Sequence, residues 1–194
     1  DAYIESGSRL EGPIYIGSNS KVFGGKIKNT SIGNYCKVAG EVSDSIFSSY
    51  SNKAHSGFVG HSYVGSWVNL GASTTTSNLK NTYGEINLDI AGEKIFTDQI
   101  FIGSFIGDHV KTGIGTKLNT GSVIGFGSNI YGLDLHQKYI PPFSWGQSQK
   151  YQLYDLDKFI STAEKAMSRR SIDLTKSEVD TITYLYSNFT QNRG

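Results

Sequence analysis

The stretch from residue 52 to residue 80 holds most of the side chains that could carry out chemistry. It contains two histidines, His55 and His61, and two asparagines, Asn69 and Asn78. Imidazole titrates near neutral pH, which makes histidine the natural general base. We single out His55 as the candidate base because it follows Lys53 closely in an irregular part of the chain. His61 is expected either near His55 or at a corner of the repeat.

We expect simpler roles for the other two histidines. His109 is expected to be a solvent-facing strand residue, and His136 is expected to lie in a loop. A metal site formed by His55, His61 and either Asp108 or His109 is an alternative. The chain has no H-E-x-x-H and no paired-cysteine pattern, so we predict that it holds no metal.

Packing roles also account for several polar residues. Asparagine side chains form amide ladders in stacked flat coils, so Asn69 and Asn78 fit a packing role as well as a binding role. The hydroxyl run at residues 73–77 has high β-propensity. The single cysteine, Cys36, is interpreted as a small packed side chain rather than a catalytic thiol.

Aliphatic residues spaced six apart run through most of the chain and must position these side chains. Six is neither the spacing of an amphipathic helix nor that of an ordinary strand. It fits three short strands per coil, with each ladder residue stacked inside a narrow prism. Scattered β-hairpins are the alternative. The ladder residues are Ile4, Leu10, Ile16, Val22, Ile32, Val38, Val64, Leu70, Ile100, Ile106, Thr112, Leu118, Ile124 and Ile130.

The ladder has interruptions. One step, from Ile27 to Ile32, is five residues long, and the repeat lapses around residues 43–59. Residues 79–99 carry no ladder and are expected to leave the prism as a loop or hairpin, where function is often found. Glycines that follow ladder residues, such as Gly17 and Gly33, are expected to adopt a positive φ at the corners.

The C-terminal part of the chain has a helical pattern. Residues 139–146 form a connector, and residues 154–170 predict a helix with an apolar face. Thr175 and Glu178 have the spacing of a capping box for a second helix. We therefore divide the chain into a β-helix at 1–138, with an inserted loop near 80–99, and a connector with helices at 139–194. The helices are expected to cap the open end or to pack on a neighbouring chain.

Composition excludes several partner classes. The net charge of +1 gives no general attraction to nucleic acid or to anionic membranes. No apolar run reaches the length of a transmembrane helix, about 18 residues. The lone cysteine and the lack of a signal-peptide pattern indicate a reducing, cytoplasmic setting. The ladder is under way at Ile4 without a polar cap, so we expect a domain to precede it.

The ladder resembles the left-handed parallel β-helix of the hexapeptide-repeat acyltransferases, an all-β fold. Residues 52–80 are similar to the acetyltransferase half of the bifunctional N-acetylglucosamine-1-phosphate uridyltransferase / glucosamine-1-phosphate acetyltransferase. That family carries K-A-G-H-L-x-Y-x-G and then I-G-x-x-x-N-I-G-A-G-T-x-x-x-N. This chain has K-A-H-S-G-F-V-G and then V-G-S-W-V-N-L-G-A-S-T-T-T-S-N, aligned without a gap from His55 to Asn78. The likeness to uridyltransferase-like sugar nucleotidyltransferases covers nearly the whole chain.

The resemblance implies roles for individual residues. His55 matches the base that takes a proton from the sugar amine. The substrate-binding positions fall on Lys53, Phe58, Asn69 and Asn78, and the coenzyme positions on Ala72 and Ser73. The family is trimeric, uses acetyl-coenzyme A as co-substrate, and has sites between subunits.

Several positions depart from the family pattern. Phe58 replaces a substrate-binding tyrosine, and Ser73 replaces a glycine. Ser43 stands where the family has a phosphate-binding lysine, and the family's arginine has no equivalent. Lys26, Lys28 and Lys37 are nearby cations, but a lysine does not replace the bidentate grip of an arginine on phosphate.

The resemblance therefore implies acetyl-coenzyme A-dependent N-acyl transfer to an amino sugar phosphate, as the C-terminal part of a sugar-1-phosphate nucleotidyltransferase of sugar nucleotide biosynthesis. One alternative is a catalytically inactive scaffold that trimerises a nucleotidyltransferase domain. Another is acylation of a nucleotide sugar, favoured if residues 80–99 close over a larger acceptor. The partners implied are a sugar phosphate or nucleotide sugar and two further copies of the chain in a homotrimer.

Overall fold

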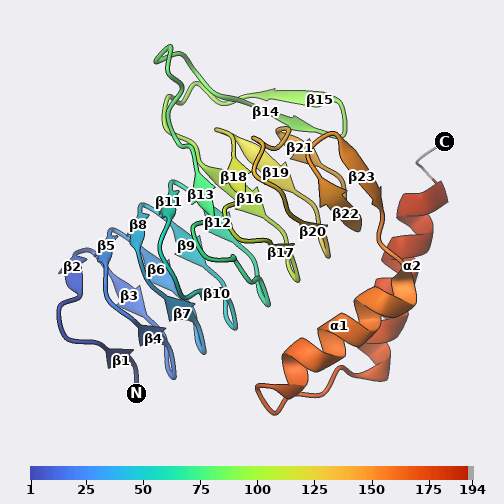
Figure 1. Ribbon diagram of the computed structural model, residues 1–194, viewed down its shortest axis with the longest axis horizontal. Helices are drawn as coiled ribbons and strands as arrows, with labels where there is room; N and C mark the ends of the chain where they lie inside the picture. The colour runs from blue at the N-terminus through green and yellow to red at the C-terminus, as the bar shows by residue number, and fades with distance from the viewer. Residues whose placement is uncertain (192–194) are drawn as a thin grey trace.

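Short parallel strands wrap around a narrow three-sided prism in successive coils (Figure 1). The computed structural model describes residues 1–191. The coils form a left-handed parallel β-helix of hexapeptide repeats, as the spacing of the ladder and the resemblance predict. We name the three sides of the prism faces A, B and C, and name each corner by the two faces that it joins.

Each face stacks one short strand from each coil. Face A holds β1 (Tyr3–Ile4), β4 (Lys21–Val22), β7 (Lys37–Val38), β10 (Asn52–Lys53), β17 (Lys111–Thr112), β20 (Asn129–Ile130) and β22 (Ser144–Gln147). Face B holds β2 (Arg9–Glu11), β5 (Lys26–Lys28), β8 (Glu41–Ser43), β11 (Phe58–Gly60), β13 (Thr75–Thr76) and β18 (Lys117–Leu118). Face C holds β3 (Tyr15–Ile16), β6 (Ser31–Ile32), β9 (Ile46–Phe47), β12 (Tyr63–Val64), β16 (Ser104–Ile106), β19 (Ser122–Ile124) and β21 (Tyr139–Ile140).

One inward side chain per strand fills the prism. From the second coil onwards these side chains are almost completely buried, and burial of each aliphatic one stabilises the fold by roughly 1.5–3 kcal/mol. They include Val22, Ile27, Ile32, Val38, Val42, Phe47, Val59, Val64, Leu70, Ile106, Leu118, Ile124, Ile130 and Ile140. Ile4 and Leu10 remain 39% and 41% exposed because the first coil has a neighbour on one side only.

The structure corrects the predicted ladder at two places. The repeat does not lapse at residues 43–59, because Phe47, Lys53 and Val59 continue it in steps of six. Lys53 occupies an inward position and is only 1% exposed. The repeat is difficult to detect here because a lysine stands at a position that is aliphatic in most other coils. Ile100 is not a ladder residue, since it is 44% exposed. The prism resumes at Ile106, which pairs with Val64.

The predicted role of the glycines after ladder residues is wrong. At the C–A corner a positive φ occurs three residues after the ladder residue, at Tyr35, Tyr50, Trp67 and His109. Gly65 instead avoids a collision between coils, since a Cβ there would lie 2.4 Å from Oδ1 of Asp108. The glycines allow coils to stack closely, and aromatic residues make the left-handed turn.

The predicted excursion around residues 79–99 is confirmed as a hairpin. Strands β14 (Asn87–Ile90) and β15 (Glu93–Phe96) pair antiparallel and stand beyond one edge of the prism (Figure 1). Ile86 is fully buried at the base of the hairpin, which anchors it to the coils. The insert therefore projects from a rigid base.

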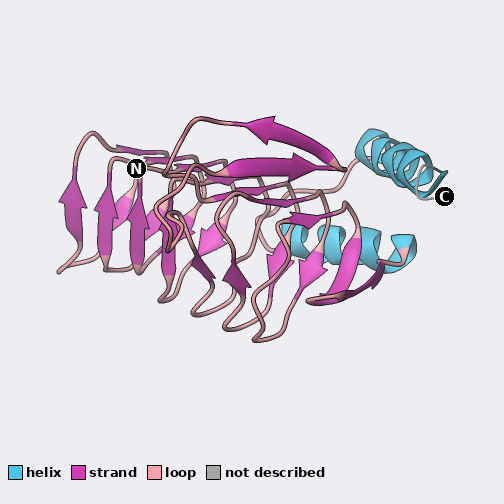
Figure 2. Ribbon diagram, turned by 90° about the horizontal axis from the view of Figure 1, so that it is seen from above, coloured by secondary structure: helices cyan, strands magenta, loops and turns pink. Residues whose placement is uncertain are grey.

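Both predicted helices are present, and they lie beside the coils (Figure 2). After β23 (Lys150–Leu153), which pairs antiparallel with β22, the chain forms α1 (Leu156–Ser168) and α2 (Lys176–Gln191). The capping box is confirmed: Thr175 N donates to Glu178 Oε2 at 2.7 Å, and Glu178 N donates to Thr175 Oγ1 at 3.3 Å.

The helices pack on the flank of their own chain's coils. Phe159 of α1 meets Phe126 and Phe143 at ring-centroid distances of 5.6 and 5.4 Å, and Tyr186 of α2 meets Phe143 at 5.0 Å. The division of the chain at residue 138 stays a prediction, and strand pairing continues beyond it through β21 and β22. Neither helix in residues 1–191 has the length and apolar character needed to cross a bilayer.

Candidate active site

His55 lies on the A–B corner, just after β10, and its side chain is exposed. The next coil stacks Ala72 and Ser73 over this turn: Ser73 N donates to Ser56 O at 3.0 Å, and the Ser56 and Ser73 hydroxyl oxygens are 3.2 Å apart. A further coil follows, with Gly115 N donating to Ala72 O at 2.8 Å. His55, Ala72 and Ser73 therefore share one rigid column.

Lys53 supports this corner from inside the prism. Its Nζ donates to the carbonyl oxygens of Ala39 and His55, each at 2.8 Å. Burial lowers the pKa of Lys53 to about 8. The structure thus gives the ammonium group a place within the coil and ties the backbone of His55 to the coil below.

Phe58 and Asn78 lie together on face B. Both approach Gly60, where an added Cβ would lie 2.3 Å from Cζ of Phe58 and 3.0 Å from Nδ2 of Asn78. Nδ2 of Asn78 also donates to Nδ1 of His61 at 2.9 Å. Among the described residues, no hydrogen bond joins Asn78 to His55 within one chain.

His61 occupies the B–C corner, one of its two expected positions. Because Nδ1 accepts from the Asn78 amide, the ring proton of the neutral imidazole lies on Nε2. That nitrogen faces Oδ2 of Asp44 at 3.9 Å, and Asp44 accepts a hydrogen bond from Asn29 at 2.7 Å. The ring of Phe101 stacks on His61 at 5.2 Å.

Of the other two histidines, His109 differs from expectation, whereas His136 lies in a loop as predicted. His109 is not solvent-facing: it lies between Trp67 and Phe159, is 9% exposed, and has its Nδ1 without a partner. Burial lowers its pKa to about 4. His136 is 1% exposed inside the last coils, where Nδ1 pairs with the Tyr151 hydroxyl. Within residues 1–191, no three histidine, cysteine or acidic side chains gather as a metal site.

Asn69 lies on face A, separate from both corners. It is exposed and bridges Asn52 and Lys111 in the parallel pairing of that face. The structure thus places the predicted site residues in three groups: His55 with Ala72 and Ser73, Phe58 with Asn78, and Asn69 alone.

Sequence reasoning missed a cationic group on the same face as Asn69. Lys37 and Lys111 flank Asn52 and Asn69 there, and Arg169 and Arg170 face them from the end of α1. Two members of this group could have been predicted from sequence, because Lys37 and Lys111 each precede an inward residue and must point outwards. The contribution of α1 had no signal, because it depends on how the helix docks.

The similarity of the chain to known proteins covers part of its length. No model of a protein family matches. The chain is 35% identical over 91 residues to a "Bifunctional sugar-1-phosphate nucleotidylyltransferase/acetyltransferase" of Sulfurisphaera tokodaii, covering 47% of this chain and 23% of that one. It is 34% identical over 131 residues to the "Bifunctional protein GlmU" of Methanococcus vannielii, covering 64% and 26%. The chain thus spans about a quarter of these relatives.

Solved structures give a weaker likeness. A variant of AntD, an N-acyltransferase from Bacillus cereus in complex with dTDP and coenzyme A, has a TM-score of 0.48 and 13% identity. The match covers 87% of this chain and 91% of that one. The similarity to the bifunctional relatives accords with the motif resemblance at residues 52–80.

Proposed function

We propose that this chain transfers an acetyl group from acetyl-coenzyme A to the amine of an amino sugar phosphate, with His55 as general base. The observation that carries the proposal is the A–B corner. There an exposed imidazole stands on a backbone fixed by Lys53, beside the small residues Ala72 and Ser73. Small side chains leave room along the column for the extended pantetheine arm. The relatives' acetyltransferase designation supports this reading.

The chemistry follows from an imidazole at that position. The amine nitrogen attacks the thioester carbonyl carbon and forms the new C–N bond, while the carbonyl oxygen becomes an oxyanion. Neutral His55 accepts the proton that the nitrogen loses. Collapse of the tetrahedral intermediate breaks the C–S bond, and the imidazolium returns the proton to the leaving thiolate. Backbone N–H groups of the coil corners are the proposed oxyanion donors.

The test is acetyl transfer by a variant that removes only the base. His55→Asn is expected to lower kcat by about 10²- to 10⁴-fold, the usual contribution of a general base, while folding is retained. Glu164→Gln, an exposed change on α1, is the control and is expected to keep wild-type activity. If His55→Asn turns over like wild type, the assignment of the base is wrong.

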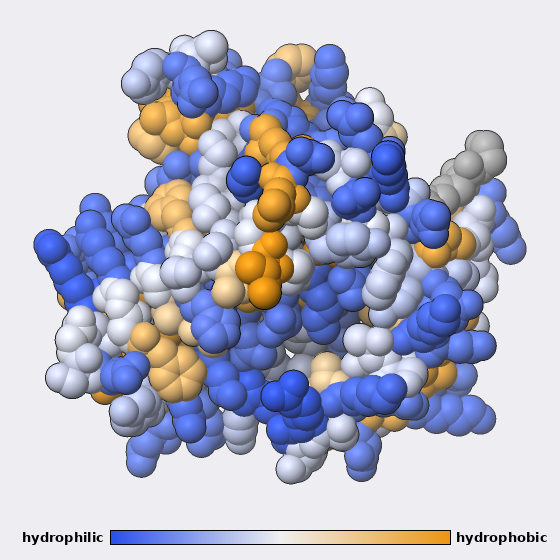
Figure 3. Space-filling model, in the orientation of Figure 1, coloured by the Kyte–Doolittle hydropathy of each residue, from blue (hydrophilic) through white to orange (hydrophobic). Residues whose placement is uncertain are grey.

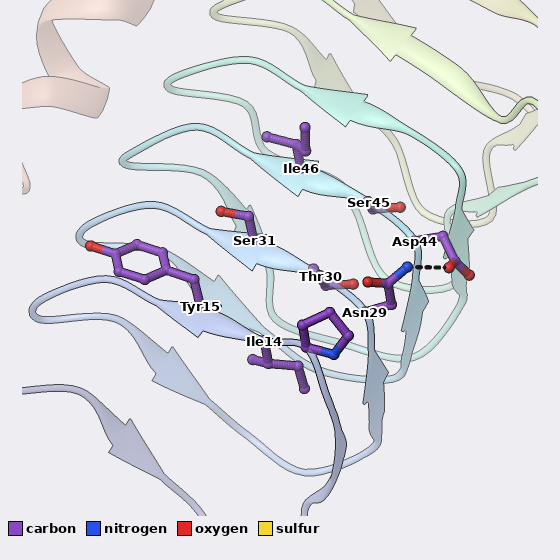
Figure 4. Close-up of a pocket in the computed structure, with 9 residues that line it drawn as sticks. Ile14, Tyr15, Asn29, Thr30, Ser31, Asp44, Ser45 and Ile46 are labelled. Carbon is purple, nitrogen blue, oxygen red and sulfur yellow. Dashed lines mark hydrogen bonds between the residues drawn. The ribbon is translucent and has the colours of Figure 1, made fainter.

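The proposal includes a homotrimer and a cytoplasmic setting. The outward residues of face C are largely apolar, with Tyr15, Ile46, Tyr63 and Phe105 exposed by 61%, 54%, 42% and 38%. Tyr15 and Ile46 also line a hollow of about 470 Å³ on this face (Figure 4). Such a face favours contact with further copies of the chain. The lone Cys36, a buried free thiol, fits a reducing compartment.

A trimerisation scaffold without acetyl transfer is the second candidate. It is favoured by Ser43 and Phe58, which cannot replace the phosphate-binding lysine and the hydroxyl that the motif resemblance implies. On this reading the chain assembles as a trimer but neither binds acetyl-coenzyme A nor turns it over, so binding of the coenzyme separates the two candidates.

A further inference from the structure

A strongly cationic pocket lies on face A, under the C-terminal end of α1. Its volume is about 330 Å³. Four of its lining side chains are cations: Lys37 on β7, Lys111 on β17, and Arg169 and Arg170 directly after α1. Among residues 1–191, no carboxylate lines it. The acyl-transfer step at His55 does not use this concentration of positive charge.

The register of face A brings the floor of the pocket together. Lys37, Asn52, Asn69 and Lys111 are successive neighbours across the face, and each directly precedes an inward residue. All four side chains therefore point outwards. Because adjacent strands are about 4.8 Å apart, the row spans about 14 Å, enough for a phosphate and the ring that carries it.

The end of α1 forms the facing wall. Nη2 of Arg170 donates to Oδ1 of Asn52 at 2.9 Å, which holds the guanidinium against face A. A guanidinium has five N–H donors, so this bond leaves others for a ligand. Phe159, Ala163 and Met167 are buried against the coils, so the arginines stand on a fixed helix.

Lys37 and the two arginines repel one another, and no neighbouring carboxylate of the described residues compensates their charge. Burial lowers the pKa of Lys37, and Arg170, Lys21 and Arg169 lower it further. In the described part of the chain, no carboxylate lies within 4.0 Å of Lys37, Lys111, Arg169 or Arg170. An anion in the pocket would relieve the repulsion, because an opposite charge favours the charged form of each group.

Lys111 is held so that its charge stays at the pocket. Its Nζ donates to the carbonyl oxygens of Trp67 at 2.7 Å and His109 at 3.2 Å. An ammonium has three N–H donors, so a third can reach a ligand. Burial lowers the pKa of Lys111 to about 8, and a bound anion would counter that effect.

The aromatic residues in the pocket wall do not offer a ring face to a nucleobase. Tyr50 and Trp67 stack on each other at 4.2 Å. The second face of Tyr50 meets Tyr35 at 5.0 Å, and that of Trp67 meets His109 at 6.2 Å. Nucleobases are bound by stacking on a free ring face. The pocket therefore suits a phosphate on a polar, hydroxyl-bearing group.

We propose that this pocket binds the phosphate group of a phosphorylated sugar. Arg169, Arg170, Lys37 and Lys111 supply the donors, and the Asn69 amide faces the sugar hydroxyls. The same phosphate monoester chemistry occurs in the 3′-phosphate of coenzyme A, which is the other source. Only the identification of the sugar phosphate with the acetyl acceptor rests on the proposed function.

The test is calorimetric titration of the full chain with glucosamine 1-phosphate and with glucosamine. The phosphorylated sugar is expected to bind at least tenfold more tightly. The double variant Arg169→Gln with Arg170→Gln is expected to lose at least tenfold in its affinity. Lys165→Gln is the matched control, since Lys165 lies on α1 but outside the pocket, and its affinity is expected to stay within twofold of wild type.

Parallel titrations with coenzyme A and dephospho-coenzyme A identify the source of the phosphate. The proposal predicts that the double variant loses the sugar phosphate and keeps wild-type discrimination between the two coenzymes. Loss of that discrimination with the sugar phosphate bound normally would overturn the sugar assignment. Equal binding of glucosamine 1-phosphate by wild type, by the double variant and by a folded Lys37→Gln variant would overturn the site itself. His55→Asn is expected to keep phosphate binding while losing transfer, so the two proposals fail separately.

Discussion

At the scale of single residues, the placement of the candidate base His55 depends on Lys53, a buried residue of the repeat that binds the His55 carbonyl oxygen. The motif resemblance places Lys53 among substrate-binding residues, whereas the structure places its ammonium inside the prism on two carbonyl oxygens. The inward position of Lys53 could have been predicted, because Lys53 lies six residues after Phe47. The lysine interrupts the aliphatic pattern, because ladder residues are ordinarily aliphatic. The exposure of His55, by contrast, was predictable from the motif alone.

Lys53→Met is expected to change how stability depends on pH. The folded-state pKa of Lys53 is lowered from 10.5 to about 8, so between these values the unfolded chain binds more protons and the free energy of unfolding rises with pH. The variant should flatten that rise by about 1.4 kcal/mol per pH unit. Urea unfolding at pH 8, 9 and 10 measures it, with the exposed Lys94→Met as control. An unchanged slope in Lys53→Met would show that the ammonium is not held in the prism.

At the scale of elements, the docking of α1 depends on the C–A corner. The stacked rings of Tyr35, Tyr50 and Trp67 continue to His109, which meets Phe159 of the helix at 5.9 Å. The apolar face of the helix was predictable from its spacing. The position at which α1 docks on the coils was not predictable. The aromatic residues that it packs against are distant in sequence and occupy left-handed turns more typical of asparagine or glycine.

Acid is expected to loosen α1 through His109. Burial lowers the pKa of His109 from 6.5 to about 4, so stability is lost as the pH falls through this window, by about 1.4 kcal/mol per pH unit. His109 faces Lys111 of the coils and Glu178 of α2, whose charges oppose and favour its protonation respectively. His109→Phe keeps an aromatic ring and removes the titration.

The measurement is thermal unfolding followed by circular dichroism at pH 7 and pH 4.5. The helical transition of His109→Phe should fall less on acidification than that of wild type. An identical fall in both proteins would show that the acid sensitivity of the helix arises elsewhere.

At the scale of the whole molecule, the three faces of the prism have different outer chemistry. Face A presents Lys21, Lys37, Asn52, Asn69 and Lys111, whereas face C presents mostly aromatic and aliphatic side chains. Figure 3 shows hydrophobic residues gathered in patches between hydrophilic ones on one side of the molecule. These outward residues directly precede the ladder residues, so sequence could have separated the faces once the coils were placed correctly. The coils cannot be placed correctly from sequence alone, because the five-residue steps and the hairpin shift the register of the repeat.

Ile46→Glu is expected to disrupt association of the chain. The substitution places a carboxylate in the apolar outer row of face C, where Ile46 is 54% exposed in one chain. Burial of an unpaired charge in an interface is strongly unfavourable. Light scattering should give three times 21.2 kDa for wild type and a single chain mass for the variant. Thr75→Glu on face B is the control, and equal masses for Ile46→Glu and wild type would exclude face C as the interface.

The proposed acetyl transfer can be measured as thiol release by the full chain mixed with acetyl-coenzyme A and glucosamine 1-phosphate. We expect saturable release of coenzyme A that requires the amine, is matched by N-acetylated product, and falls by at least about 10²-fold in His55→Asn. A folded trimer that neither binds acetyl-coenzyme A nor releases thiol with this acceptor would show that the chain does not carry out the proposed reaction. The A–B corner would then be a structural element of a scaffold.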